Sequence, residues 1–226
     1  MDKQPLDVGL LVPINNTTME PELLAWLPKG SSCRTLRIPR GKGMLTPANL
    51  PAYLAEGVKL AKDLKDEPLD VVVYGCTAAG FMAGPARDAE IAAELASVTK
   101  KRVVTTASSM SAALENVGAR RIALITPYPD HVNETLKAFL HSFEIDVLSS
   151  FKAETVDELA GITAAQIAQR AREIVRPGLD ALFIACSQLP TLAIVHDLER
   201  ELGVPVWSSI SATAWQALRA VEKAPV

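Results

Sequence analysis

The hydrophobic residues of this chain follow two patterns that alternate along it. Continuous apolar runs, such as 8–13 (VGLLVP) and 71–75 (VVVYG), are typical of strands buried on both faces of a parallel sheet. Between such runs, the segments 47–65 and 163–175 carry apolar residues at three- and four-residue spacing, which predicts helices. Strands that alternate with helices predict an α/β fold with parallel sheets, right-handed crossovers and helices on both faces.

The remaining segments extend this alternation along the whole chain. Further strands are predicted at 33–38, 102–106, 121–127, 144–149, 180–186 and 204–207, those at 33–38 and 144–149 being edge strands. Further helices are predicted at 19–26, 86–99 and 133–143. The small-residue segment 77–84 (TAAGFMAG) is predicted to be a turn.

Three landmarks of the first half recur in the same order in the second half. The matched pairs are 8–13 (VGLLVP) with 121–127 (RIALITP), 70–77 (DVVVYGCT) with 180–187 (DALFIACS), and 108–113 (SSMSAA) with 208–213 (SSISAT). Such an ordered match indicates an internal duplication. We therefore expect two pseudo-symmetric doubly wound halves, residues 1–117 and 118–226, each with a mostly parallel sheet flanked by helices. The active site is expected in the cleft between the halves.

A cysteine and a hydroxyl residue follow each strand of the central matched pair, as Cys76–Thr77 and Cys186–Ser187. In open α/β sheets, ligands bind at the carboxyl ends of the strands, where these residues lie. If the halves face each other, the two thiols approach one bound molecule from opposite sides. A cysteine in a buried strand is most often a small core residue. The matched Cys–hydroxyl pairs favour a functional role, whereas Cys33, which has no counterpart, is predicted to be structural.

Two facing thiols permit three reactions on a small carboxylic acid. They can remove and return a proton on opposite faces of a carbon acid, or one thiolate can add to an electron-poor double bond and leave after rotation. In the third reaction, a single thiol protonates the enediolate left by loss of carbon dioxide. All three need donors that stabilise a carboxylate as its charge develops. The candidate donors are Thr77, Ser187, Asn16 after the first strand and Tyr128 after its counterpart.

Composition narrows the class of protein. The chain has 226 residues, a formal net charge of −3 and three cysteines, and no apolar run approaches the length of a membrane span. We expect a cytoplasmic protein with reduced thiols, no membrane or nucleic-acid partner and a possible homo-oligomeric state. The absence of GxGxxG, Walker and metal motifs predicts no cofactor and no metal. A basic loop with Arg37, Arg40 and Lys42 could attract a dianion.

These features resemble the aspartate/glutamate racemase superfamily over essentially the whole chain. Within it, VPINNTTMEPEL at 12–23, YGCTAAG, TPYPDHVNE and IACSQLPTL resemble segments of maleate cis-trans isomerases. This resemblance implies that Cys76 adds to the double bond of a small dicarboxylate and that Cys186 delivers a proton. It also implies that Asn16 and Tyr128 hold substrate carboxylates, and it adds Pro13 to the substrate-binding residues.

The chain is also similar to arylmalonate decarboxylases, in TPYPDHVNETLKAFL and LERELGVPVWSS. Those enzymes keep the second cysteine but characteristically have glycine in place of the first, so Cys76 favours a two-thiol enzyme. Maleate isomerases carry a further substrate-binding asparagine after the fifth strand, and the chain departs from that pattern because Val156 stands there. We predict a cofactor-independent isomerase of maleate-to-fumarate type. A carbon-acid racemase, a decarboxylase and a carboxylate-binding module remain the alternatives.

Overall fold

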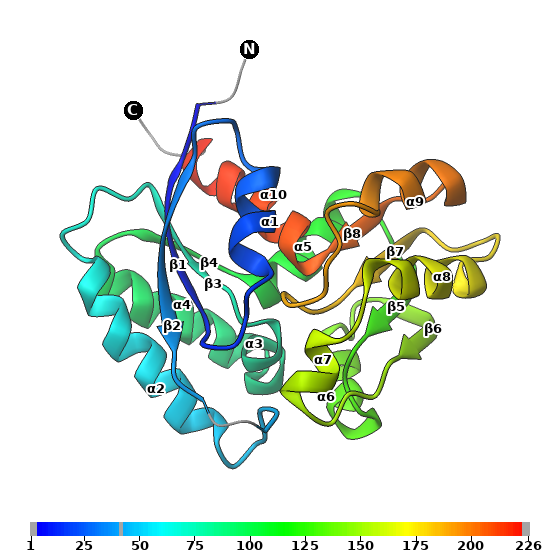
Figure 1. The fold of residues 1–226 in the computed structure, drawn as a ribbon, viewed down its shortest axis with the longest axis horizontal. Coiled ribbons are helices and arrows are strands. Elements are labelled where there is room, and N and C mark those ends of the chain that lie inside the picture. Colours follow the sequence, from blue (N-terminus) through cyan, green and yellow to red (C-terminus); the bar gives the residue numbers. More distant parts are fainter. Residues whose placement is uncertain (1–3, 41–42, 223–226) are drawn as a thin grey trace.

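Two four-stranded parallel sheets lie next to each other in the computed structural model, which describes residues 4–40 and 43–222 (Figure 1). The first sheet has the order β2-β1-β3-β4 and the second the order β6-β5-β7-β8. The strands are β1 (Asp7–Pro13), β2 (Ser32–Ile38), β3 (Val71–Tyr74), β4 (Arg102–Thr105), β5 (Arg121–Thr126), β6 (Glu144–Ser150), β7 (Ala181–Ile184) and β8 (Val206–Ser208). The order is the same in both halves, and β2 and β6 are the predicted edge strands, which confirms the predicted fold class.

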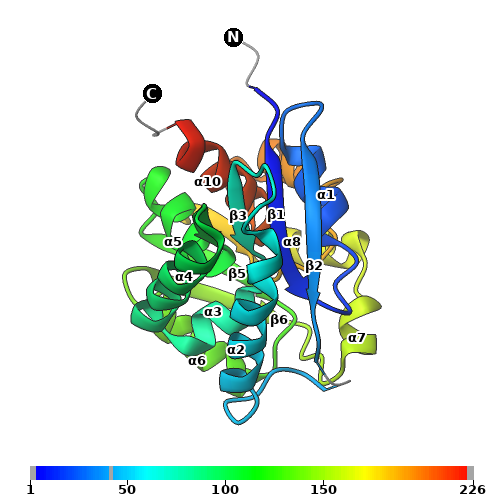
Figure 2. The same ribbon diagram turned by 90° about the vertical axis from the view of Figure 1, so that its left-hand side faces the viewer.

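Helices connect the strands and cover both sheets (Figures 1 and 2). In the first half they are α1 (Met19–Trp26), α2 (Leu50–Ala61) with the 3₁₀ turn η1 (Lys62–Leu64), α3 (Thr77–Ala83), α4 (Pro85–Thr99) and α5 (Thr106–Asn116). In the second half they are α6 (Asp130–Phe139), α7 (Val156–Ala160), α8 (Ala164–Ile174), α9 (Val195–Leu202) and α10 (Ser209–Glu222).

The repeated strands are anchored by the same contacts in both halves. The Asp70 carboxylate accepts a hydrogen bond from the Asp7 N–H at 2.8 Å, and the Asp180 carboxylate accepts one from the Arg121 N–H at the same distance. Beyond the strands, the Gly75 N–H donates to a carbonyl of β1 at 2.7 Å, and its counterpart in the second half, residue 185, donates to one of β5 at 2.8 Å. The duplication therefore sets the next residue, a cysteine in each half, at equivalent strand ends.

The prediction of a turn at 77–84 was wrong, because α3 occupies most of this segment. Cys76 has extended backbone and serves as the N-cap residue of α3. Gly80 lets α3 pack tightly, since a Cβ at that position would lie 2.4 Å from Ala107 Cβ and 2.6 Å from Asp88 Oδ1. The small residues that suggested a turn are thus needed for close helix packing.

Two helices pack in the hydrophobic core of the opposite half of the chain. Ile210 and Ala214 of α10 pack in one cluster with Val8 and Leu10 of β1, although α10 ends the second half of the chain. Met110 of α5 belongs to the large cluster that otherwise lies mostly under the second sheet. Figure 2 shows α10 beside β1 and β3. The division into 1–117 and 118–226 stays a prediction.

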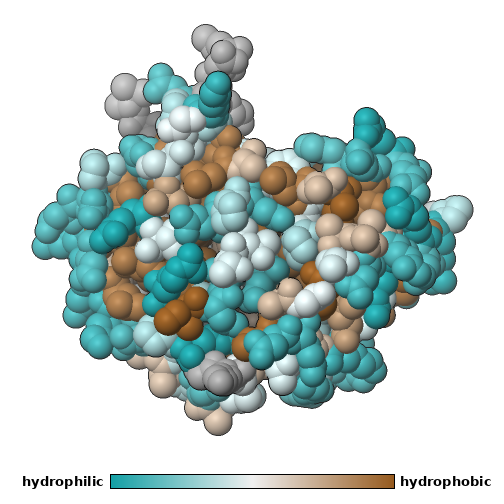
Figure 3. Space-filling model, viewed as in Figure 1, coloured by the Kyte–Doolittle hydropathy of each residue, from teal (hydrophilic) through white to brown (hydrophobic). Residues whose placement is uncertain are grey.

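The surface in Figure 3 is mostly hydrophilic along its outer rim, with apolar residues nearer the junction of the two halves. Large hydrophobic side chains that are clearly exposed are Ile14 and Leu192. Among the residues that the structure describes, none of the helices combines the length and the hydropathy needed to cross a bilayer.

Candidate active site

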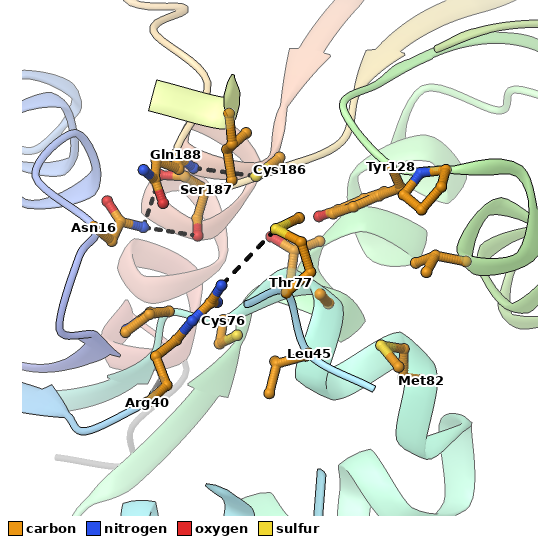
Figure 4. Close-up of a pocket in the computed structure, with 16 residues that line it drawn as sticks. Asn16, Arg40, Leu45, Cys76, Thr77, Met82, Tyr128, Cys186, Ser187 and Gln188 are labelled. Carbon is orange, nitrogen blue, oxygen red and sulfur yellow. Dashed lines mark hydrogen bonds between the residues drawn. The ribbon is translucent and has the colours of Figure 1, made fainter. Parts of the chain in front are cut away.

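A small cavity of about 40 Å³ lies between the carboxyl ends of the two sheets. All seven predicted site residues line it, and Figure 4 shows how the labelled side chains among them, which are all except that of Pro13, converge. These residues are Pro13, Asn16, Cys76, Thr77, Tyr128, Cys186 and Ser187. The structure thus brings together segments from both halves, while the chemical role of each residue stays a prediction.

Cys76 stands at the N-terminus of α3 with only 4 % of its surface exposed. Burial raises the pKa of its thiol above the ordinary value. The backbone N–H groups of Ala79 and Ala78, the hydroxyl of Tyr53 and the positive charge of Arg40 oppose this rise. Ionisation of Cys76 therefore depends on the few groups that stabilise a thiolate in this enclosed site.

Cys186 occupies the equivalent position beyond β7 and approaches the cavity from the opposite side (Figure 4). Its Sγ accepts a hydrogen bond from the Gln188 N–H at 3.4 Å. Burial raises the pKa of the Cys186 thiol, the Gln188 N–H and the Tyr128 hydroxyl lower it, and a charge on Cys76 raises it further. Because ionisation of Cys76 disfavours ionisation of Cys186, the site disfavours two thiolates at the same time.

Asn16 joins the two halves at the edge of the cavity. Its Oδ1 accepts hydrogen bonds from the N–H groups of Thr18 and Met19, at 3.1 and 3.0 Å, at the start of α1. Its Nδ2 donates to the carbonyl and hydroxyl oxygens of Ser187, at 3.2 and 3.1 Å. The Ser187 hydroxyl in turn donates to the Gly75 carbonyl at 2.9 Å. These bonds hold the loops before Cys76 and after Cys186 in a defined relation.

A buried carboxylate makes a second connection between the halves. Glu22 of α1 accepts hydrogen bonds from the N–H and hydroxyl of Thr191, at 2.9 and 3.0 Å, and from the Leu192 N–H at 3.1 Å. Burial raises the pKa of Glu22, and these hydrogen bonds oppose that rise. Together with the Asn16 contacts, this connection links the first half at α1 to the loop that follows Cys186.

Two buried hydroxyl groups at the cavity, Thr77 Oγ1 and Tyr128 Oη, make no hydrogen bond of good geometry with the described residues, although Tyr128 lies close enough to Cys186 to stabilise its thiolate. Buried polar groups are almost always hydrogen-bonded, and groups that are not commonly serve a function. Both hydroxyls are therefore available to a bound ligand. Burial also raises the pKa of Tyr128 well above its ordinary value, so its hydroxyl keeps the proton and can donate.

Other lining residues were not included among the predicted site residues. Met82 comes from α3 and Leu159 from α7, two short helices that the sequence analysis did not predict. The capping pattern at Thr155, whose side chain accepts from the Glu158 N–H, was a usable signal for α7. Arg40 was noted only as part of the basic loop, yet it also lines the cavity. Lys42 of that loop lies outside the described residues.

Within the described part of the chain, the lining of the cavity provides two thiols, neutral hydrogen-bond donors, one cationic side chain and several apolar side chains. Across the described parts of the chain, no group of three or more histidine, cysteine, aspartate or glutamate residues is arranged to hold a metal ion. The geometry permits attack by one thiol on one face of a small molecule and proton transfer on the other. The hydroxyls and the Arg40 guanidinium can stabilise negative charge.

Comparison with known proteins gives consistent matches over nearly the whole chain. A family model described as arylmalonate decarboxylase matches residues 8–226. Maleate isomerase of Nocardia farcinica is 29% identical over 225 residues, covering 95% of this chain and 90% of that protein. Arylmalonate decarboxylase of Bordetella bronchiseptica is 33% identical over 184 residues, covering 79% and 76%.

A similar solved structure is that of Nocardia farcinica maleate cis-trans isomerase, in a cysteine-to-serine variant with a covalently bound succinylcysteine intermediate. It superposes with a TM-score of 0.88 at 27% sequence identity, covering 97% of this chain and 94% of that chain. The likeness therefore extends over both sheets.

Proposed function

The chain belongs to the family described as arylmalonate decarboxylase, and within that family we propose that it is a cofactor-independent cis-trans isomerase of a small dicarboxylate, of the maleate-to-fumarate type. One observation carries the proposal: two buried thiols from equivalent strand ends line one small cavity on opposite sides. The maleate isomerase relatives support it, since they match most of the chain.

The proposed reaction begins when the Cys76 thiolate adds to one carbon of the double bond. The electron pair of the double bond moves to the neighbouring carbon and its carboxylate, and Cys186 gives its proton to that carbon. The former double bond is now a single bond and rotates. Cys186 then takes the proton back, the bond between sulfur and carbon breaks, and the double bond re-forms in the trans geometry. Atoms and charge balance, and no co-reactant is consumed.

The protonated adduct in this sequence is a succinylcysteine. This is the group that is covalently bound in the Nocardia farcinica relative. The coupled thiols fit the two roles, because a charge on Cys76 keeps the proton on Cys186. In this proposal the unpartnered hydroxyls of Thr77 and Tyr128 supply donors for the carboxylates. Asn16 and Ser187, whose side chains already donate hydrogen bonds within the protein, hold the two loops beside the substrate, and Pro13 contributes to the wall of the cavity.

A decarboxylase is the second candidate, because the family model and a 33% identical relative carry that description. One observation favours the isomerase: arylmalonate decarboxylases characteristically have glycine where this chain has Cys76.

Proton NMR in deuterated water tests the proposal with maleate, fumarate, phenylmalonate and small amino acids. We expect maleate to give fumarate, and Cys76→Ala and Cys186→Ala to abolish turnover. Cys33→Ala is the matched control, because Cys33 is half-buried in β2 and does not line the cavity. Deuterium exchange at the α-carbon of an amino acid would instead indicate a racemase, and carbon dioxide release a decarboxylase. Full turnover by both cysteine variants would refute thiol catalysis.

The predicted cytoplasmic location and homo-oligomeric state, and the predicted absence of a nucleic-acid partner, stay predictions. The proposed partner of the site is a small dicarboxylate, in agreement with the substrate class that the maleate isomerase relatives are named for.

A further inference from the structure

Arg40 has an unusual position among the charged residues of this chain. It follows β2, and its side chain reaches into the cavity from the first half, as Figure 4 shows. Of the described residues that line the cavity, Arg40 alone carries a charged side chain. Other arginines of this half pair with carboxylates, Arg34 with Glu67 and Arg37 with Glu20.

The described residues satisfy the guanidinium of Arg40 only in part. Its Nε is buried and has no hydrogen-bond partner. One nitrogen, Nη2, donates to the Gly43 carbonyl at 3.0 Å and lies 3.8 Å from Met44 Sδ. Within the described residues, no carboxylate lies within ion-pair distance of Arg40. A buried, unpaired guanidinium N–H is costly, and a guanidinium binds carboxylates with two parallel hydrogen bonds.

A cation would also balance part of the negative charge in the proposed reaction. A dicarboxylate carries two negative charges, and the Cys76 thiolate adds a third to the same enclosed space. The donors in the cavity other than Arg40 are neutral. The positive charge of Arg40 already favours the thiolate, because it lowers the pKa of Cys76. It is the available counter-charge for a carboxylate held beside that thiolate.

The geometry points to Arg40 as the specificity-determining residue that pairs with one carboxylate of a doubly charged substrate. This inference rests on the proposed function and adds to it: the neutral donors orient either acid group, and Arg40 selects the dianion over a singly charged analogue. Arg40 thus explains how the site can prefer two carboxylates although its lining is otherwise uncharged.

The test compares maleate with its monoamide, which has nearly the same shape and one charge less. Turnover and calorimetric binding are measured for wild type and for Arg40→Gln, Arg40→Lys and Arg34→Gln. A charged hydrogen bond is worth about 1.5–3 kcal/mol, so Arg40→Gln should lower kcat/KM for maleate roughly 10- to 150-fold. The monoamide should lose much less, because glutamine can hydrogen-bond its amide. Arg40→Lys should restore part of the preference for the diacid.

Arg34→Gln is the matched control, because it removes the same charge from an exposed ion pair. It should leave the ratio of maleate to monoamide unchanged. If Arg40→Gln lowers activity on both substrates equally, or on neither, Arg40 does not determine specificity and the inference is wrong. If wild type does not isomerise maleate, the proposed function fails. Calorimetric binding then still tests the inference about Arg40. The inference stands if Arg40→Gln weakens the binding of maleate more than the binding of its monoamide, and it is wrong if both are weakened equally or not at all.

Discussion

Replacing Asp88 of α4 by asparagine removes a carboxylate that burial makes unstable in its charged form. The side chain is 2 % exposed, its Oδ2 accepts a hydrogen bond from the Thr105 hydroxyl at 2.6 Å, and its Oδ1 has no partner. Burial raises the pKa of Asp88 from 3.8 to about 6, and the hydrogen bonds from Thr105 and the Ser108 N–H oppose this rise. The residue packs behind α3 without lining the cavity of the candidate site.

The raised pKa determines the sign of the effect on stability. The folded chain binds the Asp88 proton more tightly than the unfolded chain, so this contribution to stability is complete below pH 3.8 and is lost as the pH rises through about 6. The shift of roughly two pKa units corresponds to at most about 3 kcal/mol. Asparagine removes this cost but accepts a weaker hydrogen bond from Thr105, which offsets about 1 kcal/mol. We therefore expect Asp88→Asn to stabilise the fold by about 1–2 kcal/mol at pH 8.

Urea denaturation at several values between pH 4 and pH 8 measures this difference. The free energy of unfolding of the variant relative to wild type should increase with pH and level off above about 7. Asp180→Asn is a suitable comparison, because hydrogen bonds from the Arg121 and Arg120 N–H groups lower the pKa of Asp180. Its loss should destabilise the fold most at high pH. A difference for Asp88→Asn that is flat across this range, or that decreases with pH, would refute the reasoning.

Three further changes test the geometry of the site. Gly75→Ala should destabilise the fold by about 1–3 kcal/mol, since a Cβ there would lie 3.0 Å from the Leu11 carbonyl oxygen and 2.6 and 2.8 Å from two core side chains. An unchanged thermal midpoint would contradict this. Asn16→Ala removes a helix cap and both hydrogen bonds to Ser187, so the free energy of unfolding should fall by about 1–3 kcal/mol and turnover should fall with it. Wild-type stability in denaturant would show that these bonds contribute nothing. Alkylation of Cys76 by iodoacetamide, followed by mass spectrometry, should be slow at pH 7 and faster at higher pH, because burial raises the pKa of its thiol. A rate already at its maximum at pH 7 would exclude that shift.

The sequence predicted the strands and the relation between the two halves because these depend on local pattern. Buried parallel strands need continuous apolar runs, and all eight predicted strands are present, with only small differences at their ends. The helix at 19–26 was predicted with both ends correct. The duplication, visible in the sequence alone, located Cys76 and Cys186 at equivalent strand ends, and the structure places both in one cavity.

Features that depend on residues distant in the sequence were not predictable in this way. Helix α3 forms where Gly80 packs against Ala107. Helix α10 packs against the first sheet because its apolar residues are buried there. The carboxylate of Glu22 is satisfied only by the loop that carries Thr191, far along the chain. A local pattern shows which face of an element is apolar, but not which distant element covers it.

The sequence by itself therefore determined the α/β fold, its repeat and the two thiols. Only the tertiary structure decided that a loop arginine, Arg40, enters the cavity, where no carboxylate of the described residues pairs with it. The physical reason is that the arginine lies in a loop after an edge strand, where the regular alternation of a strand or helix does not fix the direction of its long side chain. That direction depends on the packing around it. The charge in the site therefore depends on how the two halves pack together.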